Sequence, residues 1–551
     1  MLKGKTIIEL TDVNTGKKET YEDHNMVTQA INEIILKRKR YLYPHDGGDG
    51  RFDNLYSSFY SMFPLYKRFF GGLMLFQNTI DESRLFLSGD DVVIGSATYG
   101  NAYSGLDPQI GSYNQTESEI NTTEKYAKFV YDFATNQGNG TISSVCLGNY
   151  HYVYHCLYGK DYSGNRVANS ALEHLLFSQN GYSSITGGQG SGSGYCPRIC
   201  LFPTMRQTET YEAATGYETP VVYDEEKGHL ITVQFTSAGG VPTYNSPVDA
   251  IKLNVYDLGL NKCTLFGGFL GDYYKAIEPL LIYEKEFTIP TMGNYSVYNT
   301  QTNYSQFAHY DSDGCVYVLG DSKNTSAEYW NANDVFTMFK FDLNVESYEN
   351  ITMETIEITN KSGLQLNVCT TWRSQLSGKR NIIIKDGYLY IKAKENDSTD
   401  PKKLVKIKIT DSTDVTVIEM NKNFNNNSWY ENVIYSCGDM IYWGNPNDSN
   451  SGSDFAVKVV NTKTNEVKYT RVKYGLSDSY SKPCVPIKGN SVYRLMGATD
   501  NDSSYHRYFY TRWYGVFASR NDYLATINNL DTPVTKTSDK TMKITYVLQG
   551  E

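Results

Sequence analysis

The sequence predicts a mostly β protein with a propeller-like body of repeated four-stranded antiparallel units and a small N-terminal α+β attachment module. Two observations predict this class. Residues 381–420 contain four short apolar or alternating runs separated by turn signals, and the pattern recurs along the chain. The composition agrees, because 48 Tyr and only 15 Pro suit twisted antiparallel sheet with polar loops.

The best-defined unit covers residues 381–420. Asp386-Gly387 between two apolar runs is a strong hairpin signal. Four short antiparallel strands in about forty residues match the size of one propeller blade. The expected strands are Asn381–Ile384, Tyr388–Ile391, Leu404–Ile409 and Val415–Met420.

The unit recurs with drift. A second copy covers residues 435–472, and partial copies begin near residues 226, 311 and 488. Each copy has a glycine in its first turn, and the spacings between these glycines are 86, 73, 51 and 51 residues. The last two spacings are blade-sized, and the first two each allow one blade with a long insertion. Generic hairpins of a sandwich or β-solenoid are the alternative, and the blade number stays open. The glycines are Gly228, Gly314, Gly387, Gly438 and Gly489.

Three regions are expected. Residues 1–40 predict a β-hairpin (Thr6–Leu10 with Lys18–Tyr21) followed by an amphipathic helix over about 26–37. This module is too short for a core of its own, so it must pack on another part of the chain or on a partner. Residues 41–120 are aromatic and irregular, as is typical of an attachment or linker region.

Residues 121–551 are expected to form the propeller-like body. A hairpin over residues 128–147 is expected to start it, and residues 181–194 are a Gly/Ser-rich insertion. The C-terminal strand 541–548 alternates cleanly and is expected to close a sheet. It either completes the last blade or pairs with the opening hairpin.

Charge and hydropathy exclude several partners. The net charge of −10 argues against nucleic acid or an anionic membrane as the main partner. The longest apolar run, Phe69–Phe76, is far below the ~18 residues that a membrane span needs. The N-terminus enters an alternating strand without an apolar signal region, so we expect synthesis in the cytoplasm without a signal peptide. Nine scattered cysteines predict buried free thiols rather than a disulfide framework or a zinc set.

No motif identifies an enzyme. Glycoside hydrolysis needs two positioned carboxylates, and nothing singles out a pair among 61 acidic residues. Ser312-Asp313-Gly314 matches part of the aspartate box of sialidase-like propellers, but Val316-Tyr317 stand where its threonine and tryptophan belong. His151 and His155 lack a third ligand nearby, and Gly187–Gly192 lacks the strand–helix context of a phosphate loop. We therefore expect no catalytic residue, no cofactor and no metal site.

Exposed aromatic side chains are the remaining candidates for binding. Tryptophan stacks on sugars and anchors protein interfaces. A buried blade-core tryptophan is an equally good interpretation of each one. The receptor-binding candidates are Trp330, Trp372, Trp429 and Trp443.

The two ends of the chain resemble a known family. Residues 8–16 and 21–28 are similar to the start of tail-fibre or receptor-binding proteins of phages, or of phage-tail-like bacteriocins, that target Firmicutes. Landmarks at 70–76, 111–118 and 131–142 resemble later parts of that family, and Thr541–Tyr546 resembles its last strand. The resemblance covers roughly the first 150 and last twenty residues, is weak between them, and includes no catalytic motif.

The resemblance implies a non-enzymatic receptor-binding protein of a phage tail or tail-like particle. Its expected partners are baseplate proteins and a protein or glycan on the Gram-positive host cell surface, and it is expected to form a homo-oligomer, dimer or trimer. Its expected location is the virion tail, outside the cell after lysis. The alternatives are a tail-associated glycan depolymerase on a propeller scaffold and a purely structural baseplate component.

Overall fold

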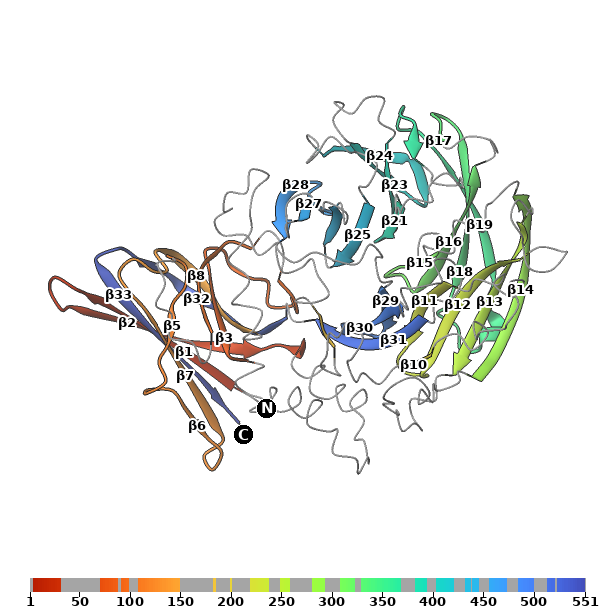
Figure 1. The fold of residues 1–551 in the computed structure, drawn as a ribbon. Helices are drawn as coiled ribbons and strands as arrows, with labels where there is room; N and C mark the ends of the chain where they lie inside the picture. The colour runs from red at the N-terminus through yellow and green to blue at the C-terminus, as the bar shows by residue number, and fades with distance from the viewer. Residues whose placement is uncertain are drawn as a thin grey trace, which may run out of the picture.

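In the computed structural model, the regular secondary structure of the described residues is almost entirely β-strand, which confirms the mostly β class (Figure 1). Within those residues, no helix is long and apolar enough to cross a membrane. The helix expected over 26–37 begins later than predicted, because Met26 and Val27 pair with Ile527 and Thr526 as part of a strand. Residues 29–30 are helical, and 31–37 lie outside the described part. The structure describes residues 3–30, 70–87, 91–98, 108–148, 182–184, 199–200, 219–236, 248–257, 280–292, 308–322, 329–367, 382–393, 403–420, 432–437, 439–444, 455–472, 484–499, 513–520 and 523–550.

Both ends of the chain belong to one ten-stranded sheet, here called the terminal sheet. Its hydrogen-bonded order is β4-β3-β8-β32-β2-β1-β33-β7-β5, with β6 paired to β7, and neighbouring strands are antiparallel. The strands are β1 (Lys3–Asp12), β2 (Lys18–Val27), β3 (Gly72–Phe76), β4 (Val93–Thr98), β5 (Ser112–Tyr113), β6 (Glu119–Asn121), β7 (Tyr126–Phe133), β8 (Gly140–Gly148), β32 (Leu524–Lys536) and β33 (Lys540–Gln549).

The last strand, β33, lies inside the terminal sheet rather than at its edge. Ile544 stands between Ile8 of β1 and Tyr131 of β7. Every second side chain of β33 is buried, as the alternation of its sequence predicts. Of the two expectations for residues 541–548, pairing with the opening hairpin is therefore confirmed.

The edges of the terminal sheet also meet. Ser96 of β4 forms a bridge with Ile110, just before β5. The Ser96 amide donates to the Gln109 carbonyl at 2.8 Å, and the Gly111 amide donates to the Ser96 carbonyl at 2.8 Å. The sheet thus curls around a hydrophobic core to which Leu10 and Phe129 both belong. The strands β1 and β2, which belong to an opening module too short to form a core of its own, pack on this shared core.

This topology moves the expected domain boundaries. The strands β7 and β8, expected to form the hairpin that starts the repeated region, do not pair with each other: β7 pairs with β33, and β8 pairs with β3 and β32. The stretch 41–120, expected to be irregular, contains β3 to β6 within its described residues. The terminal sheet is therefore built from the chain before residue 149 and after residue 522, and the repeated sheets lie between. Local hairpin patterns could not distinguish these positions, because partner choice in a sheet is decided by long-range packing.

Lys536, at the end of β32, gives a pH-dependent prediction. Its side chain is buried and donates to the Asn139 side-chain oxygen at 2.7 Å and to the Thr135 carbonyl at 3.2 Å. Burial lowers the pKa of Lys536 to about 8, although attraction to Asp539 opposes this change. Between pH 8 and the ordinary pKa of 10.5, the unfolded chain binds more protons than the folded chain. The stability cost of burying the ammonium is therefore full below pH 8 and disappears as the pH rises.

The measurement is urea unfolding of the wild type and of Lys536→Met, which does not titrate, at pH 7.5 and 9.5. The stability of the wild type relative to the variant should increase at the higher pH. An unchanged difference would show that Lys536 titrates normally in the folded protein.

Within the described residues, five groups of strands follow along the chain, called the first to fifth sheets; the first four have four strands each, and the fifth has β29, β30 and β31 with two short outer strands. The third has the four strands predicted over 381–420, except that its last strand begins at Asp411 rather than Val415, because the turn before it lies at residues 409–410. The first and fifth join through a parallel pairing of β11 with β29, and the fifth takes its outer strands, β9 and β10, from earlier in the chain. The first sheet contains β11 (Thr219–Asp224), β12 (His229–Thr236), β13 (Val248–Asp257) and β14 (Leu280–Met292), and the second contains β15 (Ala308–Tyr310), β16 (Cys315–Ser322), β18 (Val335–Asp342) and β19 (Met353–Thr359). The third contains β21 (Ile382–Lys385), β22 (Tyr388–Lys392), β23 (Lys403–Lys408) and β24 (Asp411–Glu419), and the fourth contains β25 (Asn432–Cys437), β26 (Met440–Gly444), β27 (Phe455–Asn461) and β28 (Val467–Val472). The fifth contains β29 (Cys484–Lys488), β30 (Asn490–Thr499) and β31 (Trp513–Arg520), with β9 (Tyr182–Ser184) and β10 (Ile199–Cys200). A short 3₁₀ helix, η3 (Tyr348–Asn350), and the pair β17 (Tyr329–Trp330) with β20 (Leu366–Asn367) accompany the second sheet.

The predicted glycines mark the turn between the first and second strands of each sheet. Gly228, Gly314, Gly387 and Gly489 have φ angles of +74°, +81°, +77° and +75°, which glycine adopts without steric cost. At Gly314 a side chain is also excluded, because a Cβ atom would lie 2.3 Å from the Asn344 side-chain oxygen. Gly438 holds the same position between β25 and β26, outside the described residues.

Successive sheets pack face to face. Along β16, Val316 and Val318 contact the first sheet, while the alternate residues Tyr317 and Leu319 contact the third. A further cluster joins the third sheet to the fourth. Figure 1 shows the sheets following one another around a common centre, with β11, β15, β21, β25 and β29 on the inner side. Strands buried on both faces explain the nearly continuous apolar runs of these segments.

Asp311 ties the second sheet to the third. It is buried, and its two carboxylate oxygens accept from the backbone amides of Asp386 at 2.8 Å and Gly387 at 2.7 Å. Asp311→Asn keeps the shape of the side chain but replaces one accepting oxygen with an NH₂ group, a donor that would face a backbone N–H donor. Because a hydrogen bond to a charged group contributes about 1.5–3 kcal/mol, we expect a loss of about 2–3 kcal/mol in unfolding free energy. Denaturant titration checks this, with exposed Asp411→Asn as the control; equal effects of the two variants would contradict it.

Candidate functional site: the joint between the terminal sheet and the repeated sheets

A charged loop of the terminal sheet faces the repeated sheets. This joint loop, residues 77–87 with Asp91, connects β3 to β4. Arg84 holds it together with a bidentate ion pair to Asp91, at 2.8 and 2.6 Å, and donates to the Phe86 carbonyl at 2.9 Å. Asp91 is buried and Arg84 is partly exposed. A bidentate arginine–carboxylate pair gives the loop a defined shape.

The joint loop is hydrogen-bonded to the chain at the point where the chain returns from the repeated sheets. The Leu524 amide donates to the Leu85 carbonyl at 2.9 Å, and Phe86 forms a bridge with Tyr523. Asn529 of β32 accepts from the Ile80 amide at 2.9 Å and donates to the Ile80 carbonyl at 2.8 Å. The loop is thus bonded to the terminal sheet through β32 and the residue before it.

The fourth sheet presents a second rigid charged edge. Asp439 and Lys463 form an ion pair at 3.1 Å, and the Thr462 amide donates to the Asp439 carbonyl at 2.7 Å. Asn461 accepts from the amides of Lys463 and Thr464, which shapes the turn between β27 and β28. This edge consists of sheet turns held by their own hydrogen bonds.

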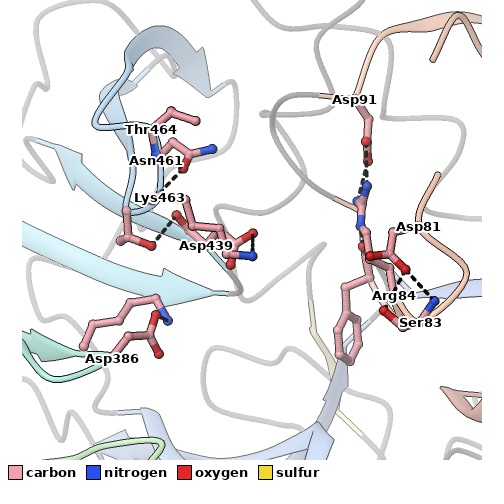
Figure 2. Close-up of polar contacts among 12 residues, drawn as sticks. Asp81, Ser83, Arg84, Asp91, Asp386, Asp439, Asn461, Lys463 and Thr464 are labelled. Carbon is pink, nitrogen blue, oxygen red and sulfur yellow. Dashed lines mark hydrogen bonds and ion pairs between the residues drawn. The ribbon is translucent and has the colours of Figure 1, made fainter. Parts of the chain in front are cut away.

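Figure 2 shows these two edges facing each other. Burial disfavours the charged Arg84, but hydrogen bonding and attraction to Asp91, with further attraction to Asp439, raise the pKa of Arg84. Hydrogen bonds from Ser83 lower the pKa of Asp81, and attraction to Arg84 and Lys463 adds to this. Arg84 and Asp81 of the loop therefore each have an opposite charge on the fourth sheet within electrostatic range.

Apolar packing continues across the same joint. Tyr223, Leu230 and Tyr256 of the first sheet and Ile487 of the fifth belong to one buried cluster with the core of the terminal sheet. Tyr223 and Ile487 lie at the end of the first strand of their sheets, and Leu230 lies at the start of the second strand, so all three are next to the turn between first and second strands. Tyr256 lies at the end of the third strand, which is at the same end of the sheet. The terminal sheet therefore contacts the repeated sheets at this end, here called the near end.

Three acidic side chains of the joint have partners: Asp91 is bonded to Arg84, Asp439 to Lys463, and Asp81 accepts from the Ser83 amide. The residues that the structure describes include no cluster of three metal-ligating side chains. Cys146 and Cys315 are buried free thiols. Burial raises the pKa of Cys146, which makes it unreactive.

The tryptophan candidates separate by position. Trp330 is completely buried between the second and third sheets and donates from its indole nitrogen to the Asp334 carbonyl at 2.8 Å, so it is not available to a receptor. Trp443 lies on β26. Trp372 and Trp429 fall outside the described residues, as do the paired histidines at 151 and 155 and the glycine-rich stretch 187–192.

Sequence reasoning did not find the joint. Arg84 and Asp91 stand seven residues apart in a polar segment, and Asp439 is hundreds of residues away. No periodicity or motif connects such positions, because their proximity depends on how the sheets pack. The one available signal was the concentration of charge at residues 81–91 within an otherwise aromatic region.

Comparisons with known proteins leave the family open. No protein-family model matches the chain, and no curated protein matches it in sequence. A subtype N11 neuraminidase-like protein of the flat-faced bat virus H18N11 is 11% identical with a TM-score of 0.24, over 64% of this chain and 96% of that chain. The polysaccharide lyase Uly1 is 9% identical with a TM-score of 0.25, over 83% and 100%. A Mycobacterium tuberculosis puromycin-hydrolyzing peptidase is 10% identical with a TM-score of 0.25, over 71% and 57%. Similarities this low say nothing about activity or ligand.

Proposed function

We propose that this protein is a non-enzymatic receptor-binding protein of a phage tail or tail-like particle. The terminal sheet attaches it to the baseplate, and the repeated sheets adhere to the surface of a Gram-positive host cell. The resemblance of residues 8–16, 21–28 and 541–546 to such proteins supports the class. The separation of the chain into a sheet that contains both ends and a body of repeated sheets supports the division of labour.

The body is proposed to be a five-bladed β-propeller. Support comes from the five units, each with its first turn at a corresponding position, and from the contacts between the first strands of successive units from the first to the fourth. The parallel pairing of β11 with β29 supports closure between the first and fifth units. Strands β9 and β10, which precede the first unit in the sequence, pair with the last strand of the fifth unit. This pairing also supports closure, because a ring needs a connection between its beginning and its end.

One observation carries the assignment of the binding face: the near end of the sheets is occupied by the terminal sheet. In an antiparallel sheet, the first and third turns lie at one end and the second connection lies at the other. The near-end turns of the third sheet hold two residues each, Asp386-Gly387 and Ile409-Thr410, whereas ten residues separate Lys392 from Lys403 at its far end. Longer connections are where binding proteins usually carry specificity. We therefore assign receptor contact to the far end.

The assembly partners follow from the same proposal. The protein is a homo-oligomer, dimer or trimer, within the symmetric tail, and several weak contacts per particle produce avidity. Its working location is the virion tail, released by lysis. Its target is a protein or glycan on the host surface, read without a cofactor.

The test is binding of the fluorescently labelled full chain to a panel of intact Gram-positive cells, with soluble sugar measured in the same tube. The expected result is saturable binding, displaced by unlabelled protein, with no sugar released. Gram-negative cells serve as the control surface. Release of sugar would replace the proposal with a glycan depolymerase. Absence of binding to every strain, together with co-purification with tail particles, would replace it with a structural baseplate component.

A further inference from the structure

The amine of Lys536 is buried against the side-chain amide of Asn139. Lys536 is only 1% exposed, and its Nζ donates to the Asn139 Oδ1 at 2.7 Å and to the Thr135 carbonyl at 3.2 Å. Neither of these bonded partners carries a negative charge. Burying an ammonium group without a bonded carboxylate is costly. The site therefore favours any change that removes this charge.

The pairing of the sheet brings the two side chains together. Lys536, the last residue of β32, pairs with Gly140, the first residue of β8, and Asn139 directly precedes Gly140. The Asn139 Nδ2 donates to the Thr135 carbonyl at 3.0 Å, so the same carbonyl accepts from both side chains. Nζ is thus held beside Oδ1, the oxygen bonded to the amide carbon of Asn139.

The buried amine is also a nucleophile near neutral pH. Burial lowers the pKa of Lys536 to about 8, against an opposing attraction to Asp539 on the turn before β33. The connection between β7 and β8 presents two neutral groups to the amine, the Thr135 carbonyl and the Asn139 amide. At pH 8 about half of the Lys536 side chains therefore carry the neutral amine, whereas an ordinary lysine is almost entirely protonated. A lysine desolvated in this way is an activated nucleophile.

We propose that Lys536 and Asn139 form an intramolecular isopeptide bond, with release of ammonia. The Nζ–Cγ bond forms and the Cγ–Nδ2 bond of Asn139 breaks. One proton of the neutral amine passes to the departing nitrogen through solvent, which reaches the exposed Asn139 side chain. Atoms and charges balance without an oxidant or another reactant. The product amide is neutral, so the buried charge is removed.

The link lies where it resists a pull on the repeated sheets. The chain leaves β8 at Gly148 and returns at Leu524, and these two residues are paired on adjacent strands. A pull on the inserted sheets therefore separates β8 from β32 starting at this pair. Lys536 and Gly140 pair at the other end of the two strands, so a covalent link there keeps the strands joined after their hydrogen bonds break. The bond itself does not depend on the proposed receptor binding.

Mass spectrometry of the full chain tests the bond. Protein purified at pH 6.5, where the ammonium form dominates, is incubated for several days at pH 7 and at pH 9, and its intact mass and tryptic peptides are measured. Lys536→Arg keeps the positive charge but removes the nucleophile. The internal control is Lys361, whose Nζ lies 3.3 Å from the Asn333 Oδ1 in a contact where both residues are exposed.

The expected product is a chain lighter by one ammonia that yields a peptide pair joining residues 139 and 536. It should form about tenfold faster at pH 9 than at pH 7, as the fraction of neutral amine rises with a pKa of about 8, and it should be absent from Lys536→Arg. Absence of the joined peptides at both pH values would overturn the proposal. So would a loss of ammonia at Asn139 that persists in Lys536→Arg, since Gly140 rather than Lys536 would then be the nucleophile. Equal linking of Lys361 to Asn333 would also overturn it, because burial would then play no part.

Discussion

Deletion of residues 540–551 is expected to unfold the terminal sheet while the repeated sheets stay folded. The deletion removes β33, which pairs with β1 on one side and β7 on the other. It also removes four side chains that are at most 2% exposed, and at about 2 kcal/mol each their burial contributes about 8 kcal/mol. Whole domains are stable by only about 5–15 kcal/mol, so the remaining strands should not hold. The four side chains are Met542, Ile544, Tyr546 and Leu548.

Limited proteolysis with peptide mapping measures this outcome. In the truncated protein, residues 3–148 should be cleaved rapidly, whereas residues 308–420 should remain protected as in the wild type. A milder variant, Ile544→Ala, should produce the same pattern at a higher temperature. Protection of residues 3–148 in the truncated protein would contradict the role given to β33. Simultaneous digestion of the whole chain would contradict the independence of the two units.

Trp330→Ala is expected to destabilise the repeated sheets more than Asp311→Asn does. Trp330 is fully buried, packs against Phe336 with ring centroids 5.2 Å apart, and belongs to the cluster that joins the second and third sheets. Removing such a side chain leaves a cavity and costs about 3–5 kcal/mol. Trp330→Phe should cost less, because it keeps most of the contact and loses mainly the hydrogen bond to the Asp334 carbonyl.

Denaturant unfolding followed by circular dichroism measures both Trp330 variants. The order of stability should be wild type, then Trp330→Phe, then Trp330→Ala. A wild-type unfolding profile for Trp330→Ala would show that the side chain is a surface group after all, and would restore it as a receptor-binding candidate.

The sequence was most informative where pairing is local. The strands expected over residues 381–420 occur as β21 to β24, because the Asp386-Gly387 turn fixes their register within a few residues. Asp386 and Gly387 have φ angles of +52° and +77°, as a tight hairpin requires. The turn glycines likewise identified the position of each repeated unit before its strand bounds were known.

Sequence reasoning was weaker where pairing is long-range. The segments of β7 and β8 have the same local hairpin pattern as the repeats, yet they do not pair with each other, because β33 pairs with β7 and β32 pairs with β8, about four hundred residues later in the chain. Trp330 has polar neighbours in sequence that suggested exposure, but the second and third sheets enclose it. The joint between Arg84 and Asp439 is of the same kind. In each case, the deciding contacts come from how whole sheets pack, which no window of the sequence contains.

The division of labour between the two units is tested most directly by the binding of three proteins to the same intact Gram-positive cells: the wild type, the 540–551 deletion and Trp330→Ala. Adhesion is assigned to the repeated sheets and attachment to the terminal sheet. The deletion variant should therefore still bind cells but no longer enter particles, and Trp330→Ala should lose cell binding in denaturant concentrations that leave the wild type bound. Loss of cell binding in the deletion variant, with normal binding by Trp330→Ala under those conditions, would contradict this assignment.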